Sequence, residues 1–519
     1  MTKPPDTSQA ALAGEGVLAS KTVIGAAWLL TWRMFSRSMG LVSTLILARV
    51  LVPGDFGIVA MATTFAAAVD ALSQIGVQDA LVRHLRDDRT LFDTGFTLQL
   101  GRAVITSAII AGAAPAASVW FNEPRLIPLL LVLAAASLVS GFENIGIVEF
   151  SRAMRFDVQF QLNSLPRLLQ VGVTIAMALL LKSYWALLAG MVVAKVARTV
   201  MSYWVHPYRP RLKIAGWQEL AGFSFWTWAA CIASLVWDRI DPFVLGPLLG
   251  PARLGLYLLA LELAVLPVSE FVEPATYALF AGFAKAQKQG GSSIRHGPLV
   301  TAMLVMCIAP FTITISCASG YVVASLLGPK WAAASPLVAI MAWLCLFSPL
   351  SYVCNAVLVA NGYVRRNFIG KVIASFVKLA VLLVAVSVTQ RLDFIAAAIV
   401  VCVTIESCAF MLLLRGTDRV HFGPMIGAIG RSLLAGSVVV LVLYQAGLAW
   451  NDVSLPTFQA FVHGSLIGAL VIVLYGALVL ALWLLAGRPA GAETRLLDLA
   501  SRFMRRFGQR VPTATSAPP

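Results

Sequence analysis

The chain has 519 residues, of which 59% are hydrophobic and only 12% are charged. A soluble globular protein carries roughly 25% charged residues, so the composition excludes a soluble enzyme, a disordered protein and a disulfide scaffold. The stretches outside the apolar runs are too short to fold an independent domain, and the phosphate-binding pattern G-x-x-x-x-G-K-[ST] does not occur. We therefore expect this protein to act inside or across a membrane.

Apolar runs of about 20 residues or more, the length of a membrane-spanning helix, follow one another along the chain. We expect an all-α, polytopic membrane protein. Its fourteen predicted transmembrane helices lie at 22–48, 57–78, 94–119, 126–148, 164–182, 184–205, 221–247, 254–280, 298–327, 336–361, 368–389, 394–415, 427–449 and 459–486.

The cysteines give no sign of redox or metal chemistry. Seven cysteines fall in apolar runs, at Cys231, Cys307, Cys317, Cys345, Cys354, Cys402 and Cys408. Their odd number and the absence of C-x-x-C predict neither disulfides nor a zinc site, so we interpret them as small core residues. We expect no cofactor and no metal.

The loops indicate the orientation, because cytoplasmic loops carry an excess of Lys and Arg. Loops on the side of the N-terminus, together with the C-terminal tail, hold most of these residues outside the spans. The opposite loops hold only Arg49, Arg125, Lys182, Arg253, Lys330 and Arg391. We expect both termini in the cytoplasm, which requires an even number of spans. The net charge of +15 is then a topology signal rather than a sign of nucleic-acid binding.

Two parts of the sequence resemble each other at an offset of 198 residues. Trp28 aligns with Trp226, and residues 53–57 align with 251–255 as the pattern P-x-x-[FL]-G, which predicts an equivalent periplasmic turn in each copy. Both copies begin on the cytoplasmic side, so the repeats are parallel, as in transporters with two six-helix lobes. The expected parts are a disordered N-terminus at 1–21, an N-lobe at 22–205, an interlobe linker at 206–220, a C-lobe at 221–415, two further helices at 427–486 and a cytoplasmic tail at 487–519.

The two tails differ in pattern. The first 21 residues lack the apolar core and cleavage site of a signal peptide, so we expect the first span to be retained. In the C-terminal tail, apolar residues recur at helical spacing beside arginines, which predicts a basic amphipathic helix on the inner leaflet. These residues are Leu496, Ala500, Phe503 and Phe507, with Arg502, Arg505 and Arg506.

Several motifs occur together in a specific order. L-A-R-V-L-V-P-G-D-F-G at 47–57 follows G-A-A-W at 25–28, and D-A-L-S-Q-I-G-V stands at 70–77. M-R-F at 154–156 and L-G-P-K-W at 327–331 come later. The first of these motifs resembles the first periplasmic turn of Wzx/WzxC-like polysaccharide flippases, in the multidrug/oligosaccharidyl-lipid/polysaccharide exporter superfamily. The others resemble that family's second-span signature and loops. The resemblance covers nearly the whole chain.

The resemblance implies two six-helix lobes around a central cavity, with two extra C-terminal helices, in the bacterial inner membrane. It implies movement of undecaprenyl-pyrophosphate-linked oligosaccharide from the cytoplasmic to the periplasmic leaflet. Further partners would be the lipid bilayer and, as a candidate, the polysaccharide polymerase and export machinery.

Charged residues inside the spans carry information without the family. A mid-span Arg or Lys costs roughly 2.5–3.5 kcal/mol on insertion scales, so such residues should face a wet cavity or a charged partner. Cations outnumber acids in the first six spans, whereas acids outnumber cations in the next six. Cations near span ends, namely Arg167, Lys371 and Arg431, can instead reach the interface, and Arg102 fits either description.

Two pairs of cations have helical spacing. Arg33 and Arg37 lie four residues apart in the first span, and Lys195 and Arg198 lie three apart in the sixth, so each pair shares one helix face. Because Arg offers a planar, permanently charged fork to phosphate, we hypothesise that these four residues bind the lipid pyrophosphate. The alternative is that they form structural ion pairs with Asp70 and Glu143.

Acidic and aromatic residues suggest further roles. Clustered acids in a membrane cavity can share protons, hold Na⁺ or accept hydrogen bonds from sugars. For this cation-coupling or glycan-binding role we name Asp70, Asp238, Asp241, Glu262 and Glu270, with neutralisation by Arg239 as the alternative for its neighbours. Trp226, Trp228 and Trp237, with Tyr257, could stack on sugar rings, although such residues more often belong to the core or the interfacial belt.

The predicted function is flipping of a lipid-linked oligosaccharide by alternating access, with a cation gradient as a candidate driving force. The alternatives are a cation-coupled multidrug exporter and a peptidoglycan-precursor flippase of the same superfamily. A membrane polymerase or glycosyltransferase would need a sizeable catalytic loop, and the loops here are too short, so we expect no enzyme.

Overall fold

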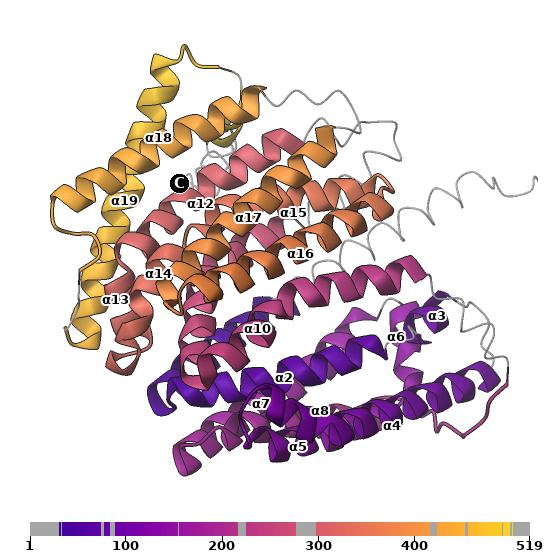
Figure 1. Ribbon diagram of the computed structural model, residues 1–519. Coiled ribbons are helices and arrows are strands. Elements are labelled where there is room, and N and C mark those ends of the chain that lie inside the picture. The colour runs from indigo at the N-terminus through magenta and orange to yellow at the C-terminus, as the bar shows by residue number, and fades with distance from the viewer. Residues whose placement is uncertain are drawn as a thin grey trace, which may run out of the picture. The chain divides into compact units, whose positions relative to one another are not determined.

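The computed structural model describes residues 28, 31–32, 34–73, 77–83, 89–153, 155–215, 225–276, 297–415, 423–451, 455–489, 491–498 and 501. Within these residues the chain forms helices and no strand (Figure 1), which confirms the expected all-α class. The chain divides into two compact units, Met1–Leu258 and Leu259–Pro519. The expected lobe boundaries rest on the sequence repeat and stay a prediction.

The first unit consists of long helices joined by short connections. A helix over residues 34–50 is followed by α2 Pro53–Leu72, α3 Val77–Arg83, α4 Arg89–Trp120, α5 Leu126–Gly141, η1 Ile145–Ile147, α6 Val148–Arg152, α7 Phe156–Leu181, α8 Trp185–Val205 and α10 Phe225–Ala264, whose last turns belong to the second unit. α7 packs along α8, α4 packs along α5, and α5 also contacts α2 and α8 (Figure 1). This arrangement places α2, α4, α5, α7 and α8 around shared polar side chains.

The second unit is built in the same way. Its elements after α10 are η2 Val268–Val272, α12 Gly297–Cys317, α13 Ser319–Leu326, η4 Pro329–Ala334, α14 Ser335–Met341, α15 Leu344–Ala360, α16 Val364–Val388, α17 Leu392–Arg415, α18 Gly423–Gln445 and α19 Thr457–Leu485. α12 contacts α15, α18 and α19, and buried residues such as Val305, Val439 and Val471 fill the space between these helices.

The helices that the structure describes give fewer candidate spans than the expected fourteen. In the described part of the chain, ten helices are long and apolar enough to cross a membrane, or up to twelve if each of two bent helix pairs is one span. The pairs bend by 65° between Gly141 and Ile145 and by 52° between Met341 and Leu344. The count of fourteen is therefore not confirmed. The expected first span, 22–48, is only partly described, and α10 contains parts of two expected spans.

A single glycine breaks α10 where a loop was predicted. Gly250 has φ 77° and ψ 169°, a conformation that other residues adopt only under strain. Pro251 follows and begins the second arm, where a proline costs no hydrogen bond because the first N–H groups of a helix have no partner within it. The connection between the seventh and eighth predicted spans is thus shorter than expected.

The P-x-x-[FL]-G pattern is the first turn of a helix in both copies, and the prediction of a periplasmic turn over all five residues was wrong. Pro53 begins α2, and the backbone N–H of Val52 donates to the Asp55 carboxylate at 3.2 Å, which caps this helix end. Pro251 stands in the same way at the start of the second arm of α10. The helix starts earlier because proline and the capping acid favour its first turn.

The two copies of this pattern contact each other through their glycines. A Cβ placed on Gly57 would overlap the carbonyl oxygen of Pro251, and a Cβ on Gly255 would overlap the carbonyl oxygen of Pro53. Only glycine allows two helix backbones to approach so closely. By contrast, a Cβ on Gly54 has no heavy atom within 4 Å. The repeat seen in the sequence is therefore a reciprocal contact within the first unit.

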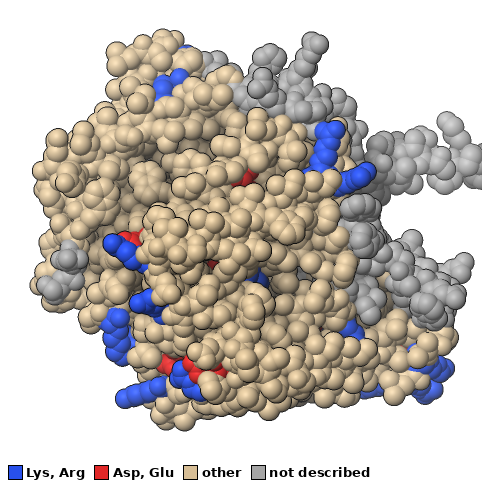
Figure 2. Space-filling model, viewed as in Figure 1, with Lys and Arg blue, Asp and Glu red and all other residues tan. Residues whose placement is uncertain are grey.

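The surface is that of a protein surrounded by lipid. Large apolar side chains such as Val119, Trp204, Phe458 and Leu485 are more than three-quarters exposed, which a soluble monomer rarely tolerates over wide areas. On the face shown in Figure 2, charged side chains are few and most of the surface is uncharged. These features agree with membrane-spanning helices.

One cation that was expected to reach the interface has a buried partner instead. The Arg431 Nε of α18 donates to Glu493 at 2.7 Å, and the two side chains are only 17% and 4% exposed. Glu493 belongs to a helix over 492–498, from which Leu496 packs against the core. The other residues of the predicted amphipathic tail helix, Ala500, Phe503 and Phe507 with its arginines, lie outside the described residues.

Candidate functional site

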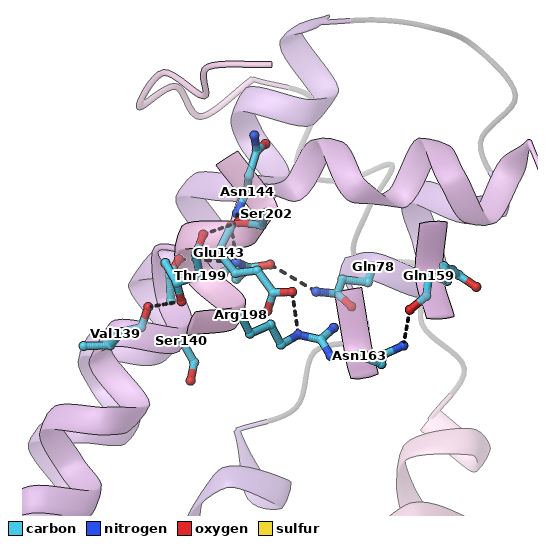
Figure 3. Close-up of polar contacts among 12 residues, drawn as sticks. Gln78, Val139, Ser140, Glu143, Asn144, Gln159, Asn163, Arg198, Thr199 and Ser202 are labelled. Atoms are coloured by element: carbon cyan, nitrogen blue, oxygen red, sulfur yellow. Dashed lines mark hydrogen bonds and ion pairs between the residues drawn. The ribbon is translucent and has the colours of Figure 1, made fainter. Parts of the chain in front are cut away.

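Glu143 is the centre of a polar cluster between α5, α7 and α8 (Figure 3). The Arg198 Nε donates to the Glu143 carboxylate at 2.8 Å, and the Arg198 Nη1 donates to the Asn163 side chain at 2.5 Å. Glu143 is 12% exposed and Arg198 is 42% exposed. The charge of Arg198 is thus matched by a nearly buried acid.

Side-chain hydrogen bonds complete the helix end beside this cluster. α5 ends at Gly141, and its Val139 and Ser140 oxygens accept the backbone N–H groups of Phe142 and Glu143 in a tightened last turn. The Gln99 amide of α4 donates to the backbone oxygens of Gly141 and Glu143, at 3.3 and 2.9 Å. The Thr199 hydroxyl of α8 donates to the Val139 oxygen at 3.2 Å. The 65° bend that follows α5 is therefore supported by polar groups from two other helices.

A second charged cluster joins α2, α4 and α8. Arg102 of α4 lies 3.5 Å from Asp70 of α2, measured from Nη2 to Oδ1. Lys195 of α8 interacts electrostatically with both residues, attractively with Asp70 and repulsively with Arg102. Its Nζ lies 3.4 Å from the Ser137 hydroxyl of α5. Two cations and one acid thus gather within the helices.

The four predicted pyrophosphate-binding residues have different surroundings. Arg33 lies outside the described residues, and Arg37 is exposed. Lys195 and Arg198 share one face of α8, as their spacing predicts, but Lys195 lies near Asp70 whereas Arg198 pairs with Glu143. The ion pair with Glu143 is the alternative that the sequence left open for Arg198.

The acids of α10 in the first unit differ in burial. Asp241 is 4% exposed and accepts a hydrogen bond from the Tyr257 hydroxyl at 2.9 Å, across the break at Gly250. Asp238, one turn earlier, is exposed. Tyr257 is completely buried, so this ring holds the two arms of α10 together and has no free face for a sugar. Its suggested stacking role was wrong.

The remaining predicted residues are placed as follows. Glu262 is exposed near the end of α10, and Glu270 lies partly buried in η2 of the second unit, next to the buried Ser269. Trp228 and Trp237 are partly buried on α10, and the side chain of Trp226 lies outside the described residues. Their roles stay predictions.

The first part of the interlobe linker, 206–215, is held against α4. The buried Asp93 carboxylate accepts the Tyr208 hydroxyl at 2.5 Å and the Arg211 backbone N–H at 2.9 Å. The Thr94 hydroxyl donates to the backbone oxygen of Ala215, and the Thr97 hydroxyl accepts the backbone N–H of Lys213. Burial and the hydrogen bond to Asp93 raise the pKa of Tyr208 above its ordinary value.

Three residues of these clusters are not among the predicted site residues. They are Arg102, which the sequence allows either near a span end or inside the protein, and the amides Asn163 and Gln99. The available signal was the residue type, because amides and cations inside apolar helices are costly unless they have partners. Pairing between them required knowledge of which helices are neighbours.

Comparisons with known proteins agree with the sequence motifs. The sequence pattern of the family described as "Polysaccharide biosynthesis protein" matches residues 46–336. The chain is 22% identical to the lipopolysaccharide biosynthesis protein WzxC of Escherichia coli K12, over 69% of this chain and 74% of WzxC. It is 24% identical to the succinoglycan biosynthesis transport protein ExoT of Rhizobium meliloti, over 60% of this chain and 64% of ExoT.

Two solved structures share the fold. The lipid II flippase MurJ in an inward closed conformation superposes with a TM-score of 0.69 at 12% identity, over 86% of this chain and 98% of MurJ. An inward-facing multidrug resistance transporter of the MATE family superposes with a TM-score of 0.57 at 14% identity, over 76% of this chain and 99% of that one. Since the family match extends over more than half of the sequence, the chain belongs to the polysaccharide biosynthesis protein family.

Proposed function

We propose that this protein moves polyprenyl-pyrophosphate-linked oligosaccharide from the cytoplasmic to the periplasmic leaflet of the bacterial inner membrane, for polysaccharide biosynthesis. The observation that carries this proposal is the charged cluster that α2, α4 and α8 hold within the helices of a polysaccharide biosynthesis family member. Charged groups at such positions mark substrate pathways in membrane proteins. WzxC and ExoT, named for lipopolysaccharide biosynthesis and succinoglycan transport, support a glycan substrate.

The head group needs cations and the glycan needs polar surroundings. We assign the pyrophosphate to the cations of the first unit, Arg33, Arg37, Lys195 and Arg198, because phosphate favours guanidinium and ammonium donors. Asp70, Asp238, Asp241, Glu262 and Glu270 are the candidates for cation coupling or for bonds to sugar hydroxyls. Trp228 and Trp237 are partly buried and can each offer part of a ring face to a sugar.

The transport step is alternating access. The head group and glycan cross through the protein while the polyprenyl tail stays in lipid, so no polar group meets the hydrocarbon core. No bond of the substrate is made or broken, and the protein is a transporter rather than an enzyme. A polysaccharide polymerase and export machinery are the partners that would use the delivered oligosaccharide.

Flipping of a fluorescent polyprenyl-pyrophosphate oligosaccharide in proteoliposomes tests this function. The comparison is between the wild type and the double variant Arg33→Ala/Arg37→Ala, with and without proton and Na⁺ gradients. Flipping by the wild type that is lost in a well-folded double variant would support the function and this head-group site.

Other results would be equally informative. Wild-type flipping that persists in the double variant would remove Arg33 and Arg37 from the site. Rates indifferent to both gradients would remove the coupling role of the acids. A folded wild type that flips none of several lipid-linked glycans, but exports organic cations, would replace this function by multidrug export.

A further inference from the structure

The cluster of Asp70, Arg102 and Lys195 carries more positive than negative charge. Arg102 lies 3.5 Å from Asp70, and Lys195 is attracted by Asp70 and repelled by Arg102. The three side chains come from three different helices, so the tertiary structure alone brings them together. Two like charges held near one acid are an arrangement that a second anion would stabilise.

Hydroxyl groups attach the end of α2 to α4. The Ser73 hydroxyl donates to the backbone oxygen of Asp70 at 2.8 Å, and the Thr106 hydroxyl donates to the Ser73 hydroxyl at 2.8 Å. Thr106 lies one helical turn from Arg102 and therefore on the same face of α4. The end of α2 is thus attached to α4 directly beside the Asp70–Arg102 pair.

The other cation on this face of α8 has different surroundings. Arg198 makes a 2.8 Å bond to Glu143, which is 12% exposed, and a 2.5 Å bond to Asn163. These contacts match its charge and occupy two of its donor groups. Lys195, three residues earlier, is instead attracted by Asp70, which also pairs with Arg102.

The contact between Asp70 and Arg102 is open to exchange. It involves one oxygen at 3.5 Å, whereas a strong guanidinium–oxyanion pair has two hydrogen bonds of about 2.7–2.9 Å. The Asp70 and Arg102 side chains are 47% and 27% exposed, so a ligand can reach them. Ion pairs of this exposure contribute little to stability.

We propose that Arg102 and Lys195 bind a phosphate group of a lipid pyrophosphate, and that Asp70 is the resident counter-ion which this phosphate displaces. The inference rests on the proposed function. It adds Arg102 to the head-group site, and it gives Asp70 the role of a displaced counter-ion in place of cation coupling or glycan binding. Without substrate, the Asp70 carboxylate balances part of the positive charge of the site. Its return to Arg102 assists release of the substrate.

Binding of farnesyl pyrophosphate to the purified full-length protein in detergent tests this site. Arg102→Gln and Lys195→Gln each weaken binding by about tenfold or more, the effect of losing a hydrogen bond to a charged group. Asp70→Asn tightens binding several-fold, because it removes the competing anion. Arg125→Gln and Asp157→Asn make the same charge changes at exposed positions and leave affinity within about twofold.

The opposite signs separate a ligand site from a structural one. Loss of structure would weaken binding in every variant, whereas only displacement of Asp70 predicts a gain. Arg102→Lys keeps the charge and should restore most of the affinity lost in Arg102→Gln. Weaker binding in a folded Asp70→Asn variant, unchanged binding in Arg102→Gln, or no binding by the wild type would overturn the proposal.

Two further arms identify the ligand. We expect inorganic pyrophosphate to compete, because the phosphate is the recognised group. Tighter binding of farnesyl pyrophosphate than of inorganic pyrophosphate would assign the site to a lipid head group. Equal affinity for farnesol would contradict a phosphate site. In the proteoliposome assay, normal flipping by Arg102→Gln/Lys195→Gln would refute this site and leave the proposed function intact, whereas a wild type that does not flip would refute the function itself.

Discussion

At the scale of single residues, the charged side chains inside the helices have specific partners. Lys195 and Arg198 share a face of α8, yet Arg198 is matched by Glu143 while Lys195 shares Asp70 with Arg102. Spacing predicted the shared face, because it depends only on helix geometry. The sequence offered Asp70 and Glu143 as alternative partners, but which acid lies beside which cation depends on how the helices pack.

The first prediction concerns Glu143. Glu143→Ala removes the acid that matches Arg198 and should lower the free energy of unfolding by about 1–3 kcal/mol. Glu143→Gln keeps an acceptor and should cost less. Thermal unfolding in detergent measures both. Asp393→Ala, which breaks the exposed pair of Arg391 and Asp393, is the control and should change stability by less than about 1 kcal/mol. Equal effects of Glu143→Ala and Asp393→Ala would contradict a structural role for the pair of Glu143 and Arg198.

The second prediction is a pH dependence of the linker contact. The pKa of Tyr208 is raised above its ordinary value by burial and by the bond to Asp93. The contribution of this hydroxyl is therefore complete below about pH 10, the ordinary tyrosine pKa. It is lost as the pH rises through the higher pKa of the folded state. Tyr208→Phe should be less stable than the wild type at pH 8, and the difference should shrink above pH 10.

Unfolding midpoints of the two proteins across this range measure the effect. The difference between them cancels the titration of other groups. A difference that stays constant from pH 8 to pH 11 would mean that folding does not change the pKa of Tyr208, which would contradict the stabilising bond to Asp93.

At the scale of helices, the two copies of the P-x-x-[FL]-G pattern contact each other. The repeat was visible in the sequence because it survives as residue identities at a constant offset. In the structure, Pro53 and Pro251 begin helical segments, and Gly57 and Gly255 lie where the two backbones approach each other closely. A repeated glycine indicates that a side chain would not fit at that position, but only the fold shows which backbone lies there.

The third prediction tests this close approach. Gly57→Ala and Gly255→Ala should each separate the two helix ends, lower the unfolding midpoint and reduce flipping, because the added methyl group overlaps a proline carbonyl. Gly54→Ala lies in the same helical turn with open space around it. It should be neutral or slightly stabilising, since alanine favours helix by up to about 1 kcal/mol. If all three variants behave alike, the contact is not essential.

At the scale of the whole molecule, the orientation in the membrane is the main expectation from charge. Lys and Arg favour one side of the predicted spans, which puts both termini in the cytoplasm. The fourth prediction follows. A fluorescent protein fused after residue 519 should fluoresce, because it folds in the cytoplasm. Alkaline phosphatase fused after Arg125, in a predicted periplasmic loop, should be active.

The same fusions exchanged between the two positions provide the control, and each should then be inactive. An active phosphatase at the C-terminus would show that the number of spans is odd or that the orientation is reversed. This result would bear directly on the span count, for which the described helices support ten to twelve.

The sequence by itself determined the membrane class, the helical fold, most helix positions and the family, because apolar runs, charge bias and short motifs are local properties. α8 begins one residue from the expected position and ends as expected, and α12, α16 and α19 begin within a few residues of theirs. The tertiary structure alone decided that Arg102 meets Asp70 and Lys195, that Arg198 meets Glu143 and that Gly57 meets Pro251. These contacts join residues far apart in the chain, and electrostatic and steric forces act over a few ångströms in space, whatever the distance along the sequence.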